Sequence, residues 1–256
     1  MGPRFEDQWR TRFEEFAELR DDDAGIAGWS PTGLDARIRR FLSLWKPAAT
    51  GRWLDAGCGA GTYTSILRKH GLEVVAIDYS LPTLRKAASR NLDVVGLLAA
   101  DVRQLPFRNE HFDGVLCFGV NQALADSRPA VEELSRQVKP GGELWIDALN
   151  RWCLANLYES VRRRYRGRPV HLRYESPRQI RRLLRECGFT NVGVHWMPIA
   201  PGHSQRLQRM IESRAVQGLL RRLPPLGLLI SHSFVVHGRK GPTSTSRSDA
   251  QRHTAA

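Results

Sequence analysis

The amino-acid sequence predicts an α/β fold in which helices cover a mostly parallel β-sheet. Between residues 52 and 147, short β-branched segments alternate with amphipathic ones, the pattern of parallel strands joined by right-handed helical crossovers. The first strand runs into a turn with three alternating glycines, Gly57, Gly59 and Gly61. A Pro-Gly-Gly turn at residues 140–142 then separates the last helix of this region from its last strand.

Two helices are predicted before the sheet. The first covers residues 5–20, where aromatic and leucine side chains fall on one helical stripe. The second covers residues 34–45 and ends before Pro47. We expect residues 1–50 to form a helical cap in front of an α/β domain at residues 51–240.

Seven strands and the helices between them follow along the chain. The expected strands cover residues 52–56, 73–78, 94–100, 112–118, 143–147, 191–197 and 231–237. The expected helices cover residues 62–70, 82–90, 128–138 and 177–188, with a further candidate at 203–223. Residues 241–256 are polar and rich in Ser, Thr and Arg, which predicts a disordered tail.

Length and composition restrict the class of protein. The chain has 256 residues, of which 41% are hydrophobic, and this suits one α/β domain with a sizeable core. It has no apolar run long enough to span a membrane, and its first residues lack the apolar region of a signal peptide. Four scattered cysteines argue against a metal site or a disulfide framework and favour a reducing compartment. We therefore expect a cytoplasmic protein.

The net charge of +13 is unevenly distributed. Residues 1–150 hold 19 Lys and Arg against 21 Asp and Glu, whereas residues 151–256 hold 20 against 5. The excess gathers in a basic insertion at about 150–173 and in a basic segment at 198–230. Such asymmetry suggests an acidic partner, which could be an anionic substrate, a membrane surface or RNA. Arginine-rich, solvated helix faces would give the same composition.

The glycine turn after the first strand predicts a ligand site. Alternating glycines let the backbone turn tightly and approach a ligand, and the turn opens into a helix whose free N–H groups face that ligand. The Gly-x-Gly-x-Gly spacing differs from the dinucleotide-binding fingerprint. Asp55, inside the preceding strand, would repel a pyrophosphate but suit an ammonium group. A zwitterionic amino-acid ligand therefore fits better than NAD.

This stretch resembles the first motif of the class I S-adenosylmethionine-dependent methyltransferases, and in particular their type 11 members. Three later motifs strengthen the resemblance: Asp78 at the end of the second strand, Asp101-Val102 after the third, and Val138-Lys139-Pro140-Gly141-Gly142 before the fifth. The resemblance covers about residues 50–190. It implies a Rossmann-like, seven-stranded, mostly parallel sheet whose last strand, at 231–237, is antiparallel.

The resemblance implies S-adenosyl-L-methionine as the cofactor and no metal. Asp78 would bind the ribose, Asp101 would contact the adenine amino group, and Val102 would pack on the adenine ring. Gly119 would lie against the sulfonium. The implied cofactor-binding set is Asp55, Gly57, Cys58, Gly59, Gly61, Asp78, Tyr79, Asp101, Val102 and Gly119.

The resemblance also implies methyl transfer to a small-molecule acceptor, at oxygen, by in-line displacement. Because the sulfonium methyl is already activated, the protein mainly aligns the nucleophile, and a general base is needed only for a poorly ionised acceptor. Many relatives carry a histidine where Ala123 stands, so one candidate base is missing here. The resemblance implies His171 as the candidate instead, because relatives often carry a residue that lines the mouth of the site just before the helix ending in Gly-Phe, here Gly188-Phe189.

Two other functions stay open. Arginines between residues 206 and 222 alternate with apolar residues, and such a segment can lie on an anionic membrane, where the acceptor would be a lipid or a quinone. A cofactor-binding module without catalysis, or an RNA-associated protein, would also keep the cofactor motifs. The lack of interleaved aromatic and basic residues argues against nucleic acid as a partner.

Overall fold

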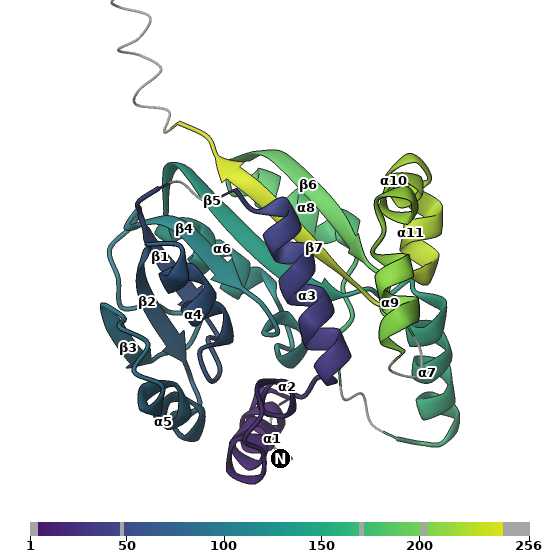
Figure 1. The fold of residues 1–256 in the computed structure, drawn as a ribbon, viewed down its shortest axis with the longest axis horizontal. Helices are drawn as coiled ribbons and strands as arrows, with labels where there is room; N and C mark the ends of the chain where they lie inside the picture. The colour runs from purple at the N-terminus through teal and green to yellow at the C-terminus, as the bar shows by residue number, and fades with distance from the viewer. Residues whose placement is uncertain (1–4, 47–48, 169–171, 201–203, 243–256) are drawn as a thin grey trace, which may run out of the picture.

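The computed structural model describes residues 5–46, 49–168, 172–200 and 204–242. Within these residues the centre is a seven-stranded sheet with the strand order β3-β2-β1-β4-β5-β7-β6 (Figure 1). The last strand, β7, pairs antiparallel with both β5 and β6, and the remaining neighbours are parallel. The predicted Rossmann-like α/β fold with an antiparallel last strand is therefore confirmed.

The strands lie close to the predicted positions. They are β1 (Arg52–Ala56), β2 (Glu73–Asp78), β3 (Gly96–Ala99), β4 (Phe112–Cys117), β5 (Val138–Leu149), β6 (Phe189–Met197) and β7 (Ser233–Lys240). β5 begins earlier than predicted because Val138 already pairs with Phe112. The register shifts before Gly114 pairs with Glu143, so the Pro-Gly-Gly segment is an irregularity inside the β5 pairing rather than a turn in front of the strand.

The helices also follow the predicted order, with additions. They are α1 (Phe5–Leu19), α2 (Asp23–Ile26), α3 (Pro31–Leu44), α4 (Thr62–Lys69), α5 (Leu81–Ser89), the short 3₁₀ helix η1 (Asn121–Ala123), α6 (Arg128–Gln137), α7 (Leu154–Tyr165), α8 (Pro177–Glu186), α9 (Gln205–Ile211), α10 (Arg214–Arg222) and α11 (Pro224–Ile230). Ser30 caps α3 by accepting a hydrogen bond from the Gly33 N–H, and Pro31 occupies its first turn.

The two faces of the sheet are covered by different helices. On one face, Leu134 of α6 and Leu184 of α8 are fully buried in a cluster that contains Leu54 of β1. On the other face, Phe41 of α3 stacks on Trp45 with ring centroids 4.9 Å apart, within a cluster that includes residues of α4. The predicted N-terminal cap thus contributes α3 to the core of the α/β layer, and the domain division at residue 50 stays a prediction.

Three expectations about the C-terminal half were wrong. The helix predicted at 203–223 is divided into α9 and α10, because the Ser213 side chain caps a new helix by accepting from the Val216 N–H. Pro224 and Pro225 begin a further helix, α11, where none was predicted, since proline is tolerated in a first turn. The basic insertion contains α7, where no helix was predicted.

The described residues lack the features of a membrane-spanning helix and of a metal site. Within the described ranges, no helix has the length and apolar character needed to cross a bilayer. The same ranges contain no group of three or more His, Cys, Asp or Glu that could bind a metal ion. The cysteines are free thiols.

Candidate functional site

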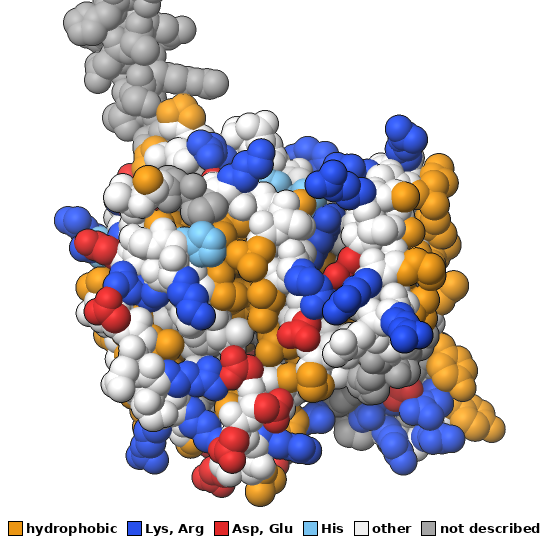
Figure 2. Space-filling view, in the orientation of Figure 1, with side chains coloured by type: hydrophobic (Ala, Val, Ile, Leu, Met, Phe, Trp, Pro, Cys, Tyr) orange, Lys and Arg blue, Asp and Glu red, His pale blue; other side chains and the backbone are white. Residues whose placement is uncertain are grey.

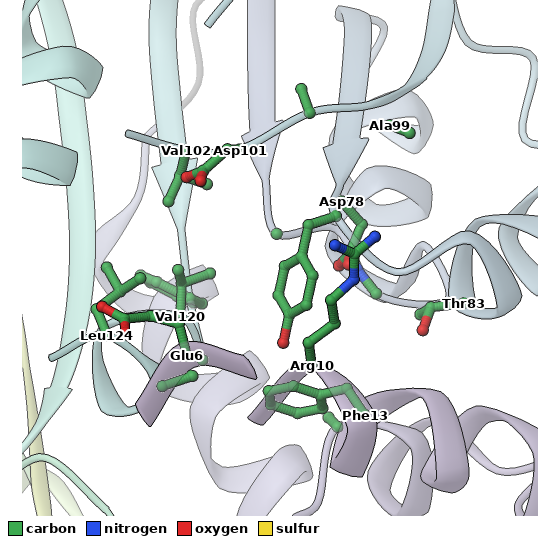
Figure 3. A pocket seen from close by; sticks show the side chains of 18 of the residues that line it. Glu6, Arg10, Phe13, Asp78, Thr83, Ala99, Asp101, Val102, Val120 and Leu124 are labelled. Atoms are coloured by element: carbon green, nitrogen blue, oxygen red, sulfur yellow. The ribbon is translucent and has the colours of Figure 1, made fainter. Parts of the chain in front are cut away.

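A cavity of about 350 Å³ lies where four parallel strands end, and α1 covers it (Figure 3). Its walls come from the turns that follow β1, β2, β3 and β4, from α1, and from the segment between α2 and α3. Parallel strands bring their carboxyl ends to one edge of a sheet, and ligands of open α/β folds bind at that edge.

The glycine turn after β1 forms one wall and is tied to the end of β2. The N–H groups of Gly57 and Cys58 both donate to the Ile77 carbonyl oxygen, at 2.8 Å each. Gly57 has φ +79°, and a Cβ at this position would lie 2.1 Å from Cγ2 of Val120. Only glycine therefore lets the turn pass so close to the chain that follows β4.

Asp78, at the end of β2, brings a buried carboxylate to the cavity. Its Oδ2 accepts a hydrogen bond from the Gly59 N–H at 2.9 Å, and its Oδ1 accepts from the Ser80 N–H at 2.9 Å. Burial raises the pKa of Asp78, against the opposing effect of these N–H donors. Within the described residues it forms no ion pair. Each carboxylate oxygen can accept a further hydrogen bond from a ligand.

Asp55, in β1 just before the glycine turn, does not line the cavity. It is buried, and its Oδ2 accepts a hydrogen bond from Oγ1 of Thr64 at 2.6 Å. Burial, together with the nearby charge of Asp78, raises the pKa of Asp55 to about 7. Cys58 and Gly61, also predicted to bind the cofactor, do not line the cavity either.

The predicted adenine-contacting residues are at the cavity wall after β3. Asp101 and Val102 both line it. The Asp101 carboxylate is held by the Arg103 guanidinium, with Nη2 of Arg103 2.7 Å from Oδ2. Partial burial works to raise the pKa of Asp101, but its hydrogen bonds and ion pair with Arg103 leave that pKa lowered. This carboxylate therefore stays ionised beside the cavity.

Helix α1, part of the segment expected to form a helical cap, covers the cavity, although none of its residues was among the predicted site residues. Phe13 meets the ring of Tyr79 edge-on with centroids 6.4 Å apart, and the Arg10 guanidinium lies 5.9 Å from the same ring. In Figure 3, Arg10 reaches from α1 toward Asp78, and Phe13 lies on α1 below it. Among the described residues, the buried Tyr79 hydroxyl has no hydrogen-bond partner, and burial raises its pKa. The aromatic stripe at residues 9–19 was the available signal.

The turn after β4 forms the opposite wall and rests on β5. Gly119, with φ +79°, donates its N–H to Oδ1 of Asp147 at 2.6 Å. A Cβ at Gly119 would lie 2.9 Å from Cζ2 of Trp29, which also lines the cavity. Asp147 and Trp29 were not predicted as site residues from the sequence. The sequence feature that could have indicated Asp147 is an acidic residue inside the strand predicted at 143–147.

The candidate base His171 lies outside the described residues. No histidine is found among the described residues that line the cavity. His195 and His237, 2.9 Å apart between Nε2 and Nδ1, belong to β6 and β7 and do not line it. Within the described part of the chain, the ionisable lining is limited to acids, arginines and Tyr79.

Comparison with known proteins identifies the family. Residues 54–146 match the family described as "Methyltransferase domain". A malonyl-[acyl-carrier protein] O-methyltransferase of Pseudescherichia vulneris is 31% identical over 182 residues, which make up 60% of this chain and 72% of that protein. The chain belongs to the class I S-adenosylmethionine-dependent methyltransferases.

Two further similarities support the family and the fold. A demethylmenaquinone methyltransferase of Corynebacterium urealyticum is 38% identical over 111 residues, 43% of this methyltransferase and 45% of that one. The structure of a Haemonchus contortus phosphoethanolamine N-methyltransferase in complex with S-adenosyl-L-methionine has a TM-score of 0.64. It shares 20% identity and covers 94% of this chain and 61% of its own, so it supports the fold alone.

The chain is therefore an enzyme whose cofactor is S-adenosylmethionine, and the cavity suits that cofactor chemically. Among the described residues, the buried Asp78 carboxylate accepts only from backbone N–H groups, so it can also accept from a diol. The glycine turn at Gly57 leaves no room for a side chain next to Val120. Val102 and Leu124 add apolar walls against which a ring can pack.

Proposed function

We propose that this methyltransferase transfers the methyl group to an oxygen atom of a small, anionic acceptor in the cavity beneath α1. One observation carries the proposal: the described residues that line the cavity include Arg10 and no histidine. An acceptor that arrives ionised, as a carboxylate or an acidic phenolate, needs no base. The name of the P. vulneris relative, an O-methyltransferase, agrees with oxygen as the acceptor atom.

The proposal gives the predicted cofactor residues separate tasks. Asp78 accepts hydrogen bonds from the ribose hydroxyls, and the turn at Gly57 and Gly59 holds the amino-acid part, with the Asp55 carboxyl group behind it. Asp101 and Val102 bind the adenine. When bound, S-adenosylmethionine supplies a methyl group already activated by the sulfonium.

The remaining work of the protein is orientation and exclusion of water. Phe13 and Trp29 close the cavity over its glycine turns, and the Arg10 guanidinium balances the charge of the acceptor. Holding two reactants in line can supply roughly 7–11 kcal/mol of a barrier. These residues align the acceptor oxygen and need not move a proton.

A second candidate acceptor is a lipid-soluble one, such as a quinone or a lipid. The cavity wall is rich in apolar side chains, including Phe13, Val102 and Leu124. The C. urealyticum relative is named a demethylmenaquinone methyltransferase. A comparison of acceptors, rather than of cofactor binding, separates this candidate from the first.

Calorimetric titration with S-adenosylmethionine tests the cofactor site. The Asp78→Asn variant should bind about 10- to 100-fold more weakly than the wild type, because charge-assisted hydrogen bonds contribute about 1.5–3 kcal/mol. Asp35→Ala, which removes an exposed carboxylate of α3, is the control and should bind as the wild type does. Equal binding by Asp78→Asn and the wild type would contradict the assignment.

A labelled-methyl assay tests the acceptor. Matched carboxylic acids, acidic phenols, amines and a short-chain quinol are supplied with the labelled cofactor. Transfer to an acid or phenol, with an Arg10→Gln variant impaired chiefly in the KM for that acceptor, supports the proposal. Transfer confined to amines, or Arg10→Gln kinetics equal to the wild type, would overturn it.

A further inference from the structure

Helix α7 is oriented with its apolar face toward solvent. Tyr158, Val161 and Tyr165 are exposed by 69%, 67% and 92%, and Leu154 and Leu157 are exposed as well. The buried residue of this helix is polar: the Asn156 side chain donates to the carbonyl oxygens of Asn150 and His232, at 2.8 and 2.9 Å. A surface helix ordinarily buries its apolar stripe, so this arrangement leaves a face without a partner.

The exposed stripe of α7 is regular and flanked by charge. At about 100° per residue, its five apolar side chains fall within a sector of about 100°. Arg162 and Arg164 stand on the two sides of that sector. Arg162 pairs with Glu159, whereas Arg164 and Arg166 form no ion pair within the described residues. The helix therefore presents an apolar stripe with basic side chains on both borders, one of which, Arg164, has no ion-pair partner among the described residues.

Neighbouring helices extend this surface. α7 packs against α11, where Leu229 and Ile230 are exposed, and Trp152 is exposed just before α7. Figure 2 shows hydrophobic side chains along the edge of the molecule where α7 and α11 lie, with basic side chains beside them. We call this surface, formed by Trp152, α7 and α11, the α7–α11 face.

The adjoining helix α10 adds a cationic depression. Arg214, Arg221 and Arg222 line it together with Ala215, Gly218 and Leu219. Three guanidinium groups beside apolar side chains suit a phosphate group whose attached chains are apolar. Leu219 and Leu223 are also exposed, so the apolar surface continues from α10 to the start of α11.

We propose that the α7–α11 face docks on the surface of an anionic phospholipid membrane. Tyrosine and tryptophan side chains prefer the headgroup level of a bilayer, where one end is apolar and the other wet, and arginines pair with lipid phosphates. A second copy of the chain fits poorly, because an isologous contact would bring the arginine borders of two copies together. An acidic protein would satisfy the arginines but not the exposed aromatic stripe.

This inference goes beyond the proposed function and does not rest on it, since docking is measured without cofactor or acceptor. The face is connected to the cavity through the chain. After α7, the Arg173 N–H donates to the Gln122 carbonyl oxygen at 3.0 Å, and Gln122 belongs to η1, whose Ala123 lines the cavity. Docking would thus bring the site close to acceptors at the membrane surface.

Vesicle flotation of the full chain tests the proposal. The protein should float with vesicles of phosphatidylcholine that contain phosphatidylglycerol, and not with pure phosphatidylcholine. Bound protein should decrease as salt is raised, because the arginines act through a screened attraction. Failure to float with anionic vesicles at low salt would overturn the proposal.

Two double variants locate the surface. Tyr158→Ser with Val161→Ser should lower the partition coefficient about tenfold, because it removes inserted apolar area. Arg164→Gln with Arg166→Gln should lower it about 30-fold, at roughly fivefold for each arginine. The matched controls change exposed residues elsewhere: Leu81→Ser with Val95→Ser, and Lys69→Gln with Arg85→Gln.

The outcomes are distinguishable. Loss of flotation in both test variants, with intact circular dichroism and with both controls floating normally, supports the proposal. Equal flotation by Tyr158→Ser/Val161→Ser and its control would assign binding to another surface and overturn it. Flotation abolished by soluble polyglutamate yet unaffected by the apolar substitutions would indicate a site for acidic proteins. A wild-type dimer that this variant dissociates would instead identify a second copy as the occupant.

Discussion

Arg37 of α3 and Asp147 of β5 form a buried ion pair that joins the N-terminal helices to the cavity wall. Nε of Arg37 lies 3.4 Å from Oδ2 of Asp147, and the side chains are 3% and 4% exposed. The other oxygen, Oδ1, accepts from the Gly119 N–H, and the Arg37 guanidinium lies 4.3 Å from the ring centroid of Trp29. One carboxylate thus fixes both the turn after β4 and the helix that precedes the sheet.

Asp147→Asn should be strongly destabilising. The substitution keeps an oxygen for the Gly119 N–H but leaves the Arg37 guanidinium buried without a counter-charge, which costs about 3–5 kcal/mol. Urea unfolding would measure the loss. Adding Arg37→Met should restore most of the stability, because the unpaired charge is then gone. A single variant as stable as the wild type would contradict the role given to this pair.

Gly57→Ala should both destabilise the fold and weaken cofactor binding. Its Cβ would meet Cγ2 of Val120 at 2.1 Å, so the wall after β4 must move. Gly141→Ala is a matched control, because Gly141 has the same φ of +79° but no atom within 4 Å of an added Cβ. The control carries only the left-handed backbone cost of about 1–2 kcal/mol. Thermal unfolding and calorimetric titration should show a larger loss of stability and of cofactor affinity for Gly57→Ala than for Gly141→Ala. Equal losses in the two variants would refute the steric argument.

Stability should depend on pH through Asp55. Its folded pKa of about 7 lies above the ordinary value of 3.8, so the folded state holds a proton that the unfolded state has lost between these pH values. Unfolding free energy therefore falls as pH rises from about 4 to about 7 and then levels off. Asp55→Asn removes this term, and its stability relative to the wild type should rise by about 3–4 kcal/mol over that range.

The quantity to measure is the difference in unfolding free energy between Asp55→Asn and the wild type, both without cofactor. Burial lowers the pKa of His195 to about 3 and of His232 to about 4, which gives an opposite slope in both proteins and cancels in the difference. Asp35→Asn, on the exposed side of α3, is the control and should not reproduce the rise. A difference that is flat with pH would show that Asp55 is ionised throughout.

The parts of the site visible in the sequence are those determined by local chain geometry. Gly57, Gly59 and Asp78 could be predicted because a tight turn and a strand end each require particular residues at fixed spacing. The pairing of Arg37 with Asp147 could not, since these residues are far apart in the chain and meet only when α3 crosses the sheet. A cap at residues 1–50 was expected, but no local pattern reveals which side chains of α1 line the cavity.

The helices that were missed have physical explanations as well. α7 was not predicted because its apolar stripe lies among consecutive arginines and is not buried in the core. The break between α9 and α10 depends on the side chain of Ser213, a residue common both in helices and at their ends. Apolar periodicity therefore predicted the 203–223 segment as helical, but it did not predict where each helix ends.

The cover formed by α1 should control how long the cofactor stays bound. Phe13→Ala removes the ring that meets Tyr79 edge-on, an aromatic contact whose loss, with the area it buries, should weaken S-adenosylmethionine binding about tenfold. The effect should lie in a faster dissociation rate, measured by stopped-flow fluorescence of Trp29. Leu19→Ala, at an exposed position of the same helix, should leave that rate unchanged. If both variants release the cofactor alike, α1 is a support for α5, against which it also packs, and not a cover for the site.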